Sequence, residues 1–402
     1  MIARFLLIPL IAATAAAASF TSDEAVNHAL RHNPELRALR HEIAEAEGRL
    51  MHAGRLANPE LEVGVRPNVE GREFSAGVDI VQKFPLTSRL RLEKEVSGAE
   101  VEVARHEVRE AEQVLAAQVR ALAVKCQDVQ ARRALQRRRA DHSRELSAAT
   151  ARAAAAGEAS PLAVAEFEFE SAEVETRLLA LDAEELALTG ALRPLLGVGS
   201  GEPLAIKGEL ADPKLAAATS DAAVTARAGI QAAEARLEAA RRNVELQRAS
   251  KWEDMTVGIG YERENVEDAG YGLRRENIVG LRVSIPLPLG KNNLSHIREA
   301  EATALRREAE SVAVASALQA DADAARAEMT ASARLFEQAS GPLLRQARSL
   351  EERYLAAYQS GQAPLTDVLR SREKRFALEA MVLEARRDFN LARVRFDSAR
   401  GR

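Results

Sequence analysis

The feature that most constrains this chain is an unbroken helical pattern from Thr87 to about Ala155. The run contains no proline, and Gly98 is its only glycine. At 1.5 Å per residue, a helix of about 65 residues is on the order of 100 Å long. Gly157 and Pro161 then supply the stop and restart signals of a helical turn. A helix of this length folded back on a second one predicts a rod rather than a globule.

The second half of the chain repeats this plan. Its helical run extends from about Asn293 to Ser360 and turns at Gly361 and Pro364. Shorter stretches match as well: ELEVGV answers DMTVGI, GVDIVQKFPL answers GLRVSIPLPL, and GEASPLAV answers GQAPLTDV. These matches indicate a tandem duplication of about two hundred residues. The two strand patterns lie about nine residues further apart in the second half, which predicts a longer second hairpin loop.

The amino end differs from both halves. Arg4 precedes the apolar run FLLIPLIAATAAAA, and small residues stand at Ala16 and Ala18. This is the pattern of a secretory signal peptide, so we expect residues 1–18 to be removed. The first repeat then covers 19–210 and the second 211–402. We expect strands at about 59–67, 73–84, 254–263 and 276–287, and long helical hairpins at about 88–195 and 291–400.

Composition supports long helices packed in coiled-coil fashion. Apolar residues make up 47% of the chain but aromatic residues only 4%. The net charge of -4 gives no global indication of a nucleic-acid partner. The arginine run RRALQRRR, from Arg132 to Arg139, spreads around more than one helical face, and we interpret it as a solvated coiled-coil surface. The single cysteine, Cys126, excludes a disulfide within one chain.

All four expected strands alternate between apolar and polar residues, with a period of two. The polar faces are rich in glycine and charged residues. Two structures fit this alternation: a small sheet that covers a soluble core, or strands of a membrane barrel. Their length of about ten residues suits a tilted barrel strand. Four strands do not close a barrel around a channel, so the membrane interpretation requires several chains. The apolar faces hold Leu61, Val63, Val65; Phe74, Ala76, Val78, Ile80; Met255, Val257, Ile259, Tyr261; and Val279, Leu281, Val283, Ile285.

These features in this order resemble the TolC-type outer-membrane efflux proteins, over essentially all of residues 22–398. The duplicated strand pairs, the strand exits FPL and LPL, and the turn G-x-x-x-L-x-D-V-L at Gly361–Leu369 carry the resemblance. NPEL at Asn33–Leu36 and NPELEV at Asn58–Val63 are typical as well. The resemblance implies a mainly helical chain with a small β part: two long antiparallel coiled-coil hairpins and four β-strands.

The resemblance also implies an assembly. Three chains would form a homotrimer whose twelve strands close one outer-membrane β-barrel, continued by an α-helical periplasmic tunnel. Pro85 and Pro288 would mark the barrel-to-tunnel junction, since proline ends a strand ladder and starts a helix. The expected function is a passive exit duct of a tripartite efflux or type I secretion system. An RND or ABC type pump of the inner membrane would drive small molecules or metal ions through it, coupled by a periplasmic adaptor (membrane fusion) protein. The layout favours the heavy-metal, CzcC-like branch.

In the family the two helical turns form the periplasmic tip. By position, Asp367 matches an aspartate of the closed aperture, and Arg370 stands where the prototype has a second one. Three copies of Asp367 would make a cation-attracting ring, unless Arg370 neutralises it. Alternatively, Asp367 only caps a helix. The alternative for the adaptor-contact candidates is that their Gly and Pro residues only make the turns. The candidates are Gly157, Glu158, Ala159, Ser160, Pro161, Gly361, Gln362, Ala363, Pro364 and Leu365.

No catalytic motif is present, so we expect no enzyme activity and no cofactor. His28 and His32 share a helical face but lack a third ligand, so we expect two surface histidines rather than a metal site. The alternative function is a soluble periplasmic coiled-coil scaffold or adaptor. An adaptor would place a lipoyl-like module between its helical arms, and the break at residues 196–215 is too short for one.

Overall fold

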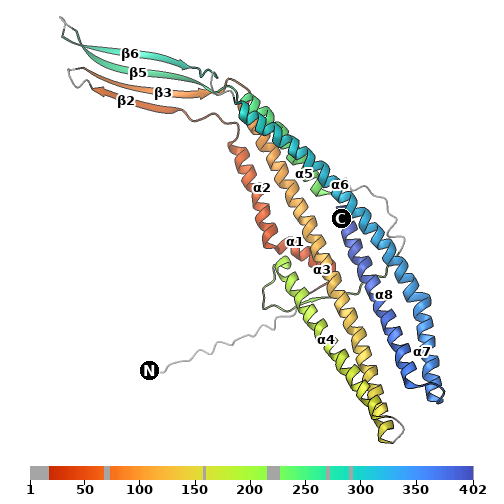
Figure 1. Ribbon diagram of the computed structural model, residues 1–402. Coiled ribbons are helices and arrows are strands. Elements are labelled where there is room, and N and C mark those ends of the chain that lie inside the picture. The colour runs from red at the N-terminus through yellow and green to blue at the C-terminus, as the bar shows by residue number, and fades with distance from the viewer. Residues whose placement is uncertain are drawn as a thin grey trace, which may run out of the picture. The chain divides into compact units, whose positions relative to one another are not determined.

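The computed structural model of the protein describes residues 18–67, 73–156, 160–214, 227–268, 272–288 and 293–401 (Figure 1). The signal peptide expected at 1–18 lies outside them except for Ala18. The chain divides into two compact units. The strand unit comprises Ala38–Glu110 and Ala228–Ser316; the helical unit comprises the residues up to Arg37, Ala111–Arg227 and those from Ala317. Each unit therefore takes segments from both sequence repeats.

The strand unit holds a four-stranded antiparallel sheet of order β2-β3-β5-β6. The hairpin from the first repeat pairs directly with the hairpin from the second (Figure 1). The helical segments of this unit come from α2, α3, α5 and α6, of which α3 and α6 continue into the helical unit. The bounds are β2 Glu60–Pro67, β3 Phe74–Phe84, β5 Met255–Asp268, β6 Gly272–Ser284, α2 Pro34–His52, α3 Arg89–Ala155, α5 Ala228–Ala249 and α6 Leu294–Gln338.

The prediction of a longer second hairpin loop was wrong. The extra residues extend the strands: β5 and β6 have 14 and 13 residues, against 8 and 11 in β2 and β3. The extension pairs Glu264 with Glu276 and Asn265 with Arg275, so both of its faces carry polar side chains. Backbone pairing needs no apolar face, and hydrophobic alternation therefore misses strands of this kind.

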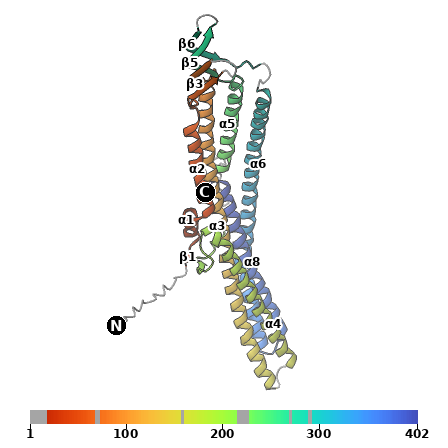
Figure 2. The same cartoon turned by 90° about the vertical axis from the view of Figure 1, so that its left-hand side faces the viewer.

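The helical unit contains two antiparallel helical hairpins. The first joins α3 to α4 (Pro161–Leu196), and the second joins α7 (Leu344–Gln359) to α8 (Leu365–Ala399). Figure 2 shows α3, α4 and α8 running alongside one another in the turned view. The unit also holds α1 (Ser22–His32) and a parallel strand pair, β1 (Ala18–Phe20) with β4 (Leu204–Ile206).

The second long helical run is interrupted, which the sequence analysis did not anticipate. A π-helical turn, η3 (Ala339–Leu343), separates α6 from α7 and contains Pro342. Proline lacks a backbone N–H, and its ring clashes with the carbonyl one turn earlier. A π turn widens the helix locally, so it accommodates the ring. The signal was the Gly-Pro pair at Gly341 and Pro342.

The NPEL stretch has a structural role. Asn33 Oδ1 accepts a hydrogen bond from the Leu36 N–H at 2.8 Å, which caps the start of α2 with Pro34 in the first helical position. Asn33 Nδ2 donates to the Leu195 carbonyl at 3.0 Å. This one buried asparagine therefore fixes the end of α4 against the start of α2.

Candidate functional site

The sheet carries a continuous apolar face. Leu61, Ile80, Ile259 and Leu281 pair in register across all four strands, and Val63, Val78, Tyr261 and Val279 form a second row. No described part of the chain covers these rows: Val63 is 68% exposed, Leu281 72% and Val279 75%. A sheet that covers a soluble core would bury this face, so the soluble-core interpretation does not fit the chain.

The opposite face of the sheet carries polar side chains and several glycines. Gly64 pairs with Gly77, and Gly260 pairs with both Asp79 and Gly280. A Cβ on Gly260 would lie 2.1 Å from Asp79 Oδ1, so a larger residue there would displace the aspartate side chain. Arg66 and Glu262 form an ion pair of 3.2 Å on the same sheet. Charged side chains thus lie over glycine backbone on one face, while the apolar rows lie on the other.

Both expected junction prolines follow strands. Pro85 comes directly after β3, and Pro288 lies four residues beyond the end of β6. Beside Pro85, Arg89 at the start of α3 holds Asp254, just before β5, through Nη2 to Oδ2 at 2.6 Å and Nε to Oδ1 at 3.3 Å. Thr87 Oγ1 donates to the Ala249 carbonyl at 2.9 Å. These contacts tie the exit of β3 in the first repeat to the entrance of β5 in the second, and sequence reasoning did not find them.

The first hairpin turn is capped. Ser160 Oγ accepts a hydrogen bond from the Leu162 N–H at 3.2 Å, and Pro161 occupies the first turn of α4. The other three candidates in this turn, Gly157, Glu158 and Ala159, lie outside the described residues.

The second hairpin turn is formed by backbone conformation and backbone hydrogen bonds. Gly361 adopts a φ of 74°, and the Gln362 N–H donates to the Ala357 carbonyl at 2.8 Å. Glycine tolerates this left-handed conformation best. Pro364 starts α8 without a side-chain cap. Ala363 and Leu365 are half-buried, so the turn presents mainly Gly361, Gln362 and Pro364 to solvent.

Asp367 lies half-buried in the first turn of α8, and Arg370 is exposed one turn later. The Asp367 N–H donates to the Pro364 carbonyl at 3.1 Å. Within the described residues the Asp367 carboxylate accepts no hydrogen bond and forms no ion pair with Arg370. Within the described residues, Asp367 therefore makes neither a side-chain cap at the start of α8 nor an ion pair with Arg370.

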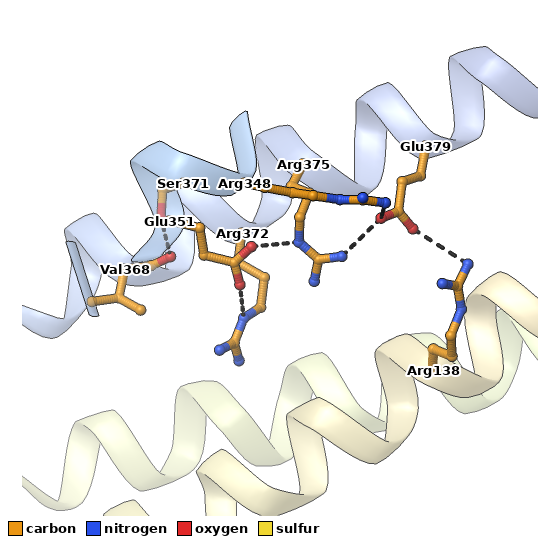
Figure 3. A network of polar contacts seen from close by, with 8 residues as sticks. All are labelled: Arg138, Arg348, Glu351, Val368, Ser371, Arg372, Arg375 and Glu379. Carbon is orange, nitrogen blue, oxygen red and sulfur yellow. Dashed lines mark hydrogen bonds and ion pairs between the residues drawn. The ribbon is translucent and has the colours of Figure 1, made fainter. Parts of the chain in front are cut away.

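An ionic cluster lies behind the second turn, in which Glu351, Glu379, Arg372 and Arg375 are largely buried while Arg138 and Arg348 are exposed (Figure 3). Glu351 of α7 accepts from Arg372 Nε at 2.9 Å and also from Arg375. Arg375 donates to Glu379 Oε1 at 2.9 Å, and Arg138 of α3 reaches Glu379 Oε2 at 3.3 Å. Glu379, whose side chain is 9% exposed, joins α3 to α8, and Glu351 joins α7 to α8.

The cluster carries an excess of positive charge. Four guanidinium groups, those of Arg138, Arg348, Arg372 and Arg375, surround the two carboxylates of Glu351 and Glu379 (Figure 3). Sequence reasoning missed this cluster, because only the antiparallel pairing of α7 with α8 brings Glu351 to the arginines. The spacing of Arg372, Arg375 and Glu379 on one face of α8 was the available signal.

The arginine run is not simply solvated. Arg132 pairs with Glu184 at 2.7 Å, Arg133 with Asp182 at 2.8 Å, and Arg139 with Glu170 at 3.4 Å, all across to α4. Arg138 faces α8 instead. The interpretation as a solvated surface was therefore wrong for Arg132, Arg133 and Arg139, since helix α4 supplies acidic partners that a single-helix view does not show, whereas the Arg138 side chain is 62% exposed.

One acid is buried within α3. Asp128 is 1% exposed and accepts from Arg132 Nε at 2.8 Å, while its Oδ1 finds no partner in the part of the chain that the structure describes. Burial raises the pKa of Asp128, although Arg132 and Arg387 oppose this. The buried Cys126 thiol has its pKa raised by burial to about 11, so it stays protonated and unreactive.

His28 and His32 stack on one face of α1 with ring centroids 4.1 Å apart. Burial and the neighbouring His32 lower the pKa of His28. The described ranges contain no group of three or more histidine, cysteine, aspartate or glutamate side chains placed to hold a metal ion. Nor is any described helix both long and apolar enough to cross a bilayer.

Comparison with known proteins identifies the family. The model of the outer membrane efflux protein family matches residues 25–198 and 220–402. No curated protein is significantly similar to the chain. Similar solved structures include the outer membrane protein VceC of Vibrio cholerae (17% identity, 94% of this chain and 96% of that chain, TM-score 0.76) and the Neisseria gonorrhoeae MtrE outer membrane channel in its open state (15%, 94% and 88%, 0.73). The Campylobacter jejuni CmeC outer membrane channel shares the fold at 11% identity (94% and 85%, 0.72). The chain belongs to the outer membrane efflux protein family.

Proposed function

We propose that this protein is the outer-membrane exit duct of a tripartite efflux or type I secretion system. Three copies form a homotrimer, and their twelve strands close one barrel. The duct is passive and has no enzyme activity. An inner-membrane pump supplies the energy, and a periplasmic adaptor connects the pump to the duct.

The exposed apolar rows of the sheet carry this proposal. Eight apolar side chains in two cross-strand rows are exposed in the described chain, and such a surface in water favours association. Lipid on this face and water on the glycine-rich polar face satisfy both sides of the sheet. Among the described strands, the edge strands β2 and β6 have no partner on their outer side, and a barrel closed by further chains would pair them.

The alternative function, a soluble periplasmic scaffold or adaptor, makes a different prediction. It requires another protein to cover the apolar rows, or the chain would aggregate. Fractionation distinguishes the two: a duct is recovered with outer membranes and released only by detergent. Recovery in the soluble periplasmic fraction would contradict the duct. The substitution Val279→Glu, in the centre of the apolar face, should shift the protein out of the membrane fraction, whereas Gly280→Ser on the polar face should not.

The junction and the turns take roles within this proposal. Pro85 and Pro288 lie where the barrel wall gives way to the tunnel wall. The two hairpin turns contact the adaptor, and the exposed positions of the second turn support that role. We propose that the protein belongs to the heavy-metal branch of the family. Its cargo would then be metal ions together with other small molecules.

Asp367 is proposed to form the aperture ring. Its carboxylate has no partner within the described chain, so three copies around an axis would attract cations. Asp367→Asn should weaken block of the reconstituted channel by divalent cations several-fold. Arg370→Ala is the matched control and should strengthen the block, because it removes an exposed positive charge one helical turn from Asp367. Unchanged block in Asp367→Asn would leave this aspartate without a role in the aperture.

A further inference from the structure

All four strands of the sheet meet connecting segments at the same end of the sheet. Glu60 at the start of β2 pairs with Val81 near the end of β3. Thr256 at the start of β5 pairs with Lys83 of β3 and with Ser284 at the end of β6. Four segments therefore leave the sheet at this end (Figure 1). We call them the junction segments: residues 53–59, 85–88, 250–254 and 285–288.

The apolar face of the sheet continues into the junction segments. On β6 every second residue from Val279 is apolar and exposed. This alternation continues through Ile285 and Leu287, beyond Ser284, which is the last paired residue of the strand. Leu86, in the segment that follows β3, is exposed as well. The apolar surface suited to lipid is therefore longer than the paired strands that carry most of it.

The two junction segments that lead from a helix into a strand share a pair of residue types. Arg55 and Leu56 precede β2, and Lys251 and Trp252 precede β5. All four residues are exposed, and neither cation forms an ion pair within the described residues. A basic residue followed by a large apolar one therefore stands at the entrance to the sheet in both repeats.

A third cation lies at the start of α3, between these two segments. Gly54 packs against it, since a Cβ on Gly54 would lie 3.1 Å from the Cβ of Lys94. On the other side, Thr87 Oγ1 donates to the Ala249 carbonyl at 2.9 Å, which holds the end of α5 against the same part of α3. Lys94 is exposed, and it too forms no ion pair in the part of the chain that the structure describes.

Unpaired charge at the junction is mainly positive. The three cations stand against one unpaired carboxylate in the described junction segments, that of Glu253, because Asp254 already binds Arg89. Lysine and arginine have long apolar stems and place their charge at the level of lipid headgroups, and tryptophan prefers the same level. Basic groups beside exposed apolar side chains therefore suit a surface that is apolar inside and anionic at its boundary.

We propose that the junction segments and the start of α3 bind anionic phospholipid of the periplasmic leaflet. The lipid phosphates contact Arg55, Lys94 and Lys251, and the adjoining acyl chains contact Leu56 and Trp252. This inference rests on the proposed function, which places the sheet in the outer membrane. It adds that the membrane boundary lies beyond the ends of the strands and that anionic lipids bind there in preference to neutral ones.

Tryptophan fluorescence in the full-length protein tests this surface directly, because Trp252 is the only tryptophan of the chain. The protein is reconstituted into two vesicle samples, both an equimolar mixture of phosphatidylcholine and phosphatidylglycerol. The samples differ only in which of the two lipids carries brominated acyl chains, and bromine quenches tryptophan at close range. Brominated phosphatidylglycerol should quench Trp252 roughly twofold more strongly than brominated phosphatidylcholine, because the basic residues enrich the anionic lipid around it.

Two double variants assign the preference to particular charges. Arg55→Gln combined with Lys251→Gln should make quenching by the two brominated lipids equal, while Trp252 stays accessible to both. Arg345→Gln combined with Arg353→Gln is the matched control, because it removes the same charge from exposed positions of α7 in the helical unit. This control should keep the preference for phosphatidylglycerol.

The outcomes separate this inference from the proposed function, provided that pore formation is measured on the same preparation. Equal quenching by both lipids in a protein that conducts would overturn the lipid preference and leave the duct intact. Absence of quenching by either lipid in a conducting protein would place Trp252 outside the bilayer and overturn the position of the boundary. A preference that persists in the junction variant would overturn the role of its two cations. A protein that neither conducts nor associates with the vesicles would contradict the proposed duct, and this inference with it.

Discussion

The two helical hairpins come from one duplicated sequence, yet they are held together differently. The first hairpin has an uninterrupted α3 of 67 residues, a side-chain cap at Ser160 and ion pairs to α4 spread along its length. The second has a π turn at Pro342, no side-chain cap at Pro364, a largely buried cluster centred on Glu351 and Glu379 between α7 and α8, and one ion pair from Glu328 of α6 to Arg395 of α8. Ion pairs spread along the first hairpin hold its two helices together over their length. In the second hairpin, the contact of α7 with α8 depends on the few residues of one cluster.

The Glu351 cluster should give the largest effect. Glu351→Gln leaves Arg372, which is largely buried, without a carboxylate partner, and leaves Arg375 with Glu379 alone. Breaking a buried pair in this way costs about 3 kcal/mol of stability. We expect faster amide hydrogen exchange in α7 and the start of α8. Glu184→Gln in the first hairpin is the control: its partner is more exposed, so the loss should stay below about 1 kcal/mol. Equal amide exchange in both variants would contradict the prediction that the second hairpin depends more strongly on its ion pairs than the first.

The cap at Ser160 should give an effect of intermediate size. Ser160→Ala removes the hydrogen bond to the Leu162 N–H and should lower the stability of the start of α4 by about 1 kcal/mol. Thr176→Ala on the same helix is the control, because its hydroxyl only bonds back to the Ala172 carbonyl. The measurement is amide exchange across residues 161–168. No change at Ser160→Ala would show that the first turn does not depend on its cap.

Substitution of Pro342 should change stability by a comparable amount, but it should raise stability rather than lower it. Proline in a helix interior costs about 3 kcal/mol, and the π turn already relieves part of that cost. Pro342→Ala should therefore stabilise the α6–α7 run by about 1 kcal/mol and slow amide exchange around Ala339. Pro194→Ala, near the end of α4, is the control and should leave exchange in α7 unchanged. Faster exchange at Ala339 would mean that the proline supports the π turn.

The smallest expected effect concerns pH. Burial raises the pKa of Asp128 in the folded protein, so the folded state binds the proton more tightly than the unfolded state. This contribution to stability is full below the unfolded pKa and is lost as pH rises through the folded pKa. Asp128→Asn should therefore gain stability relative to the original protein as pH rises from about 4 towards neutrality. Thermal unfolding at several pH values measures it, and a difference independent of pH would contradict the shift.

The sequence predicts this fold where local patterns decide it. Alternation identified the apolar rows through Val63 and Val279, and Gly361 with Pro364 identified the second turn. Hydrophobic alternation did not predict the polar end of the β5–β6 hairpin, where only backbone pairing holds the two strands together. Sequence analysis also missed the cluster around Glu351, because its members come together only when α7 packs against α8. Asp367 was found by family position, and only the structure shows that its carboxylate lacks a partner within the described chain.

The most direct test of the exit duct is single-channel conductance of the detergent-purified protein in a planar bilayer, with its mass measured in the same detergent. The apolar rows of the sheet and its unpaired edges predict stable pores from a species of three chains. A water-soluble monomer or dimer that never conducts would contradict the account.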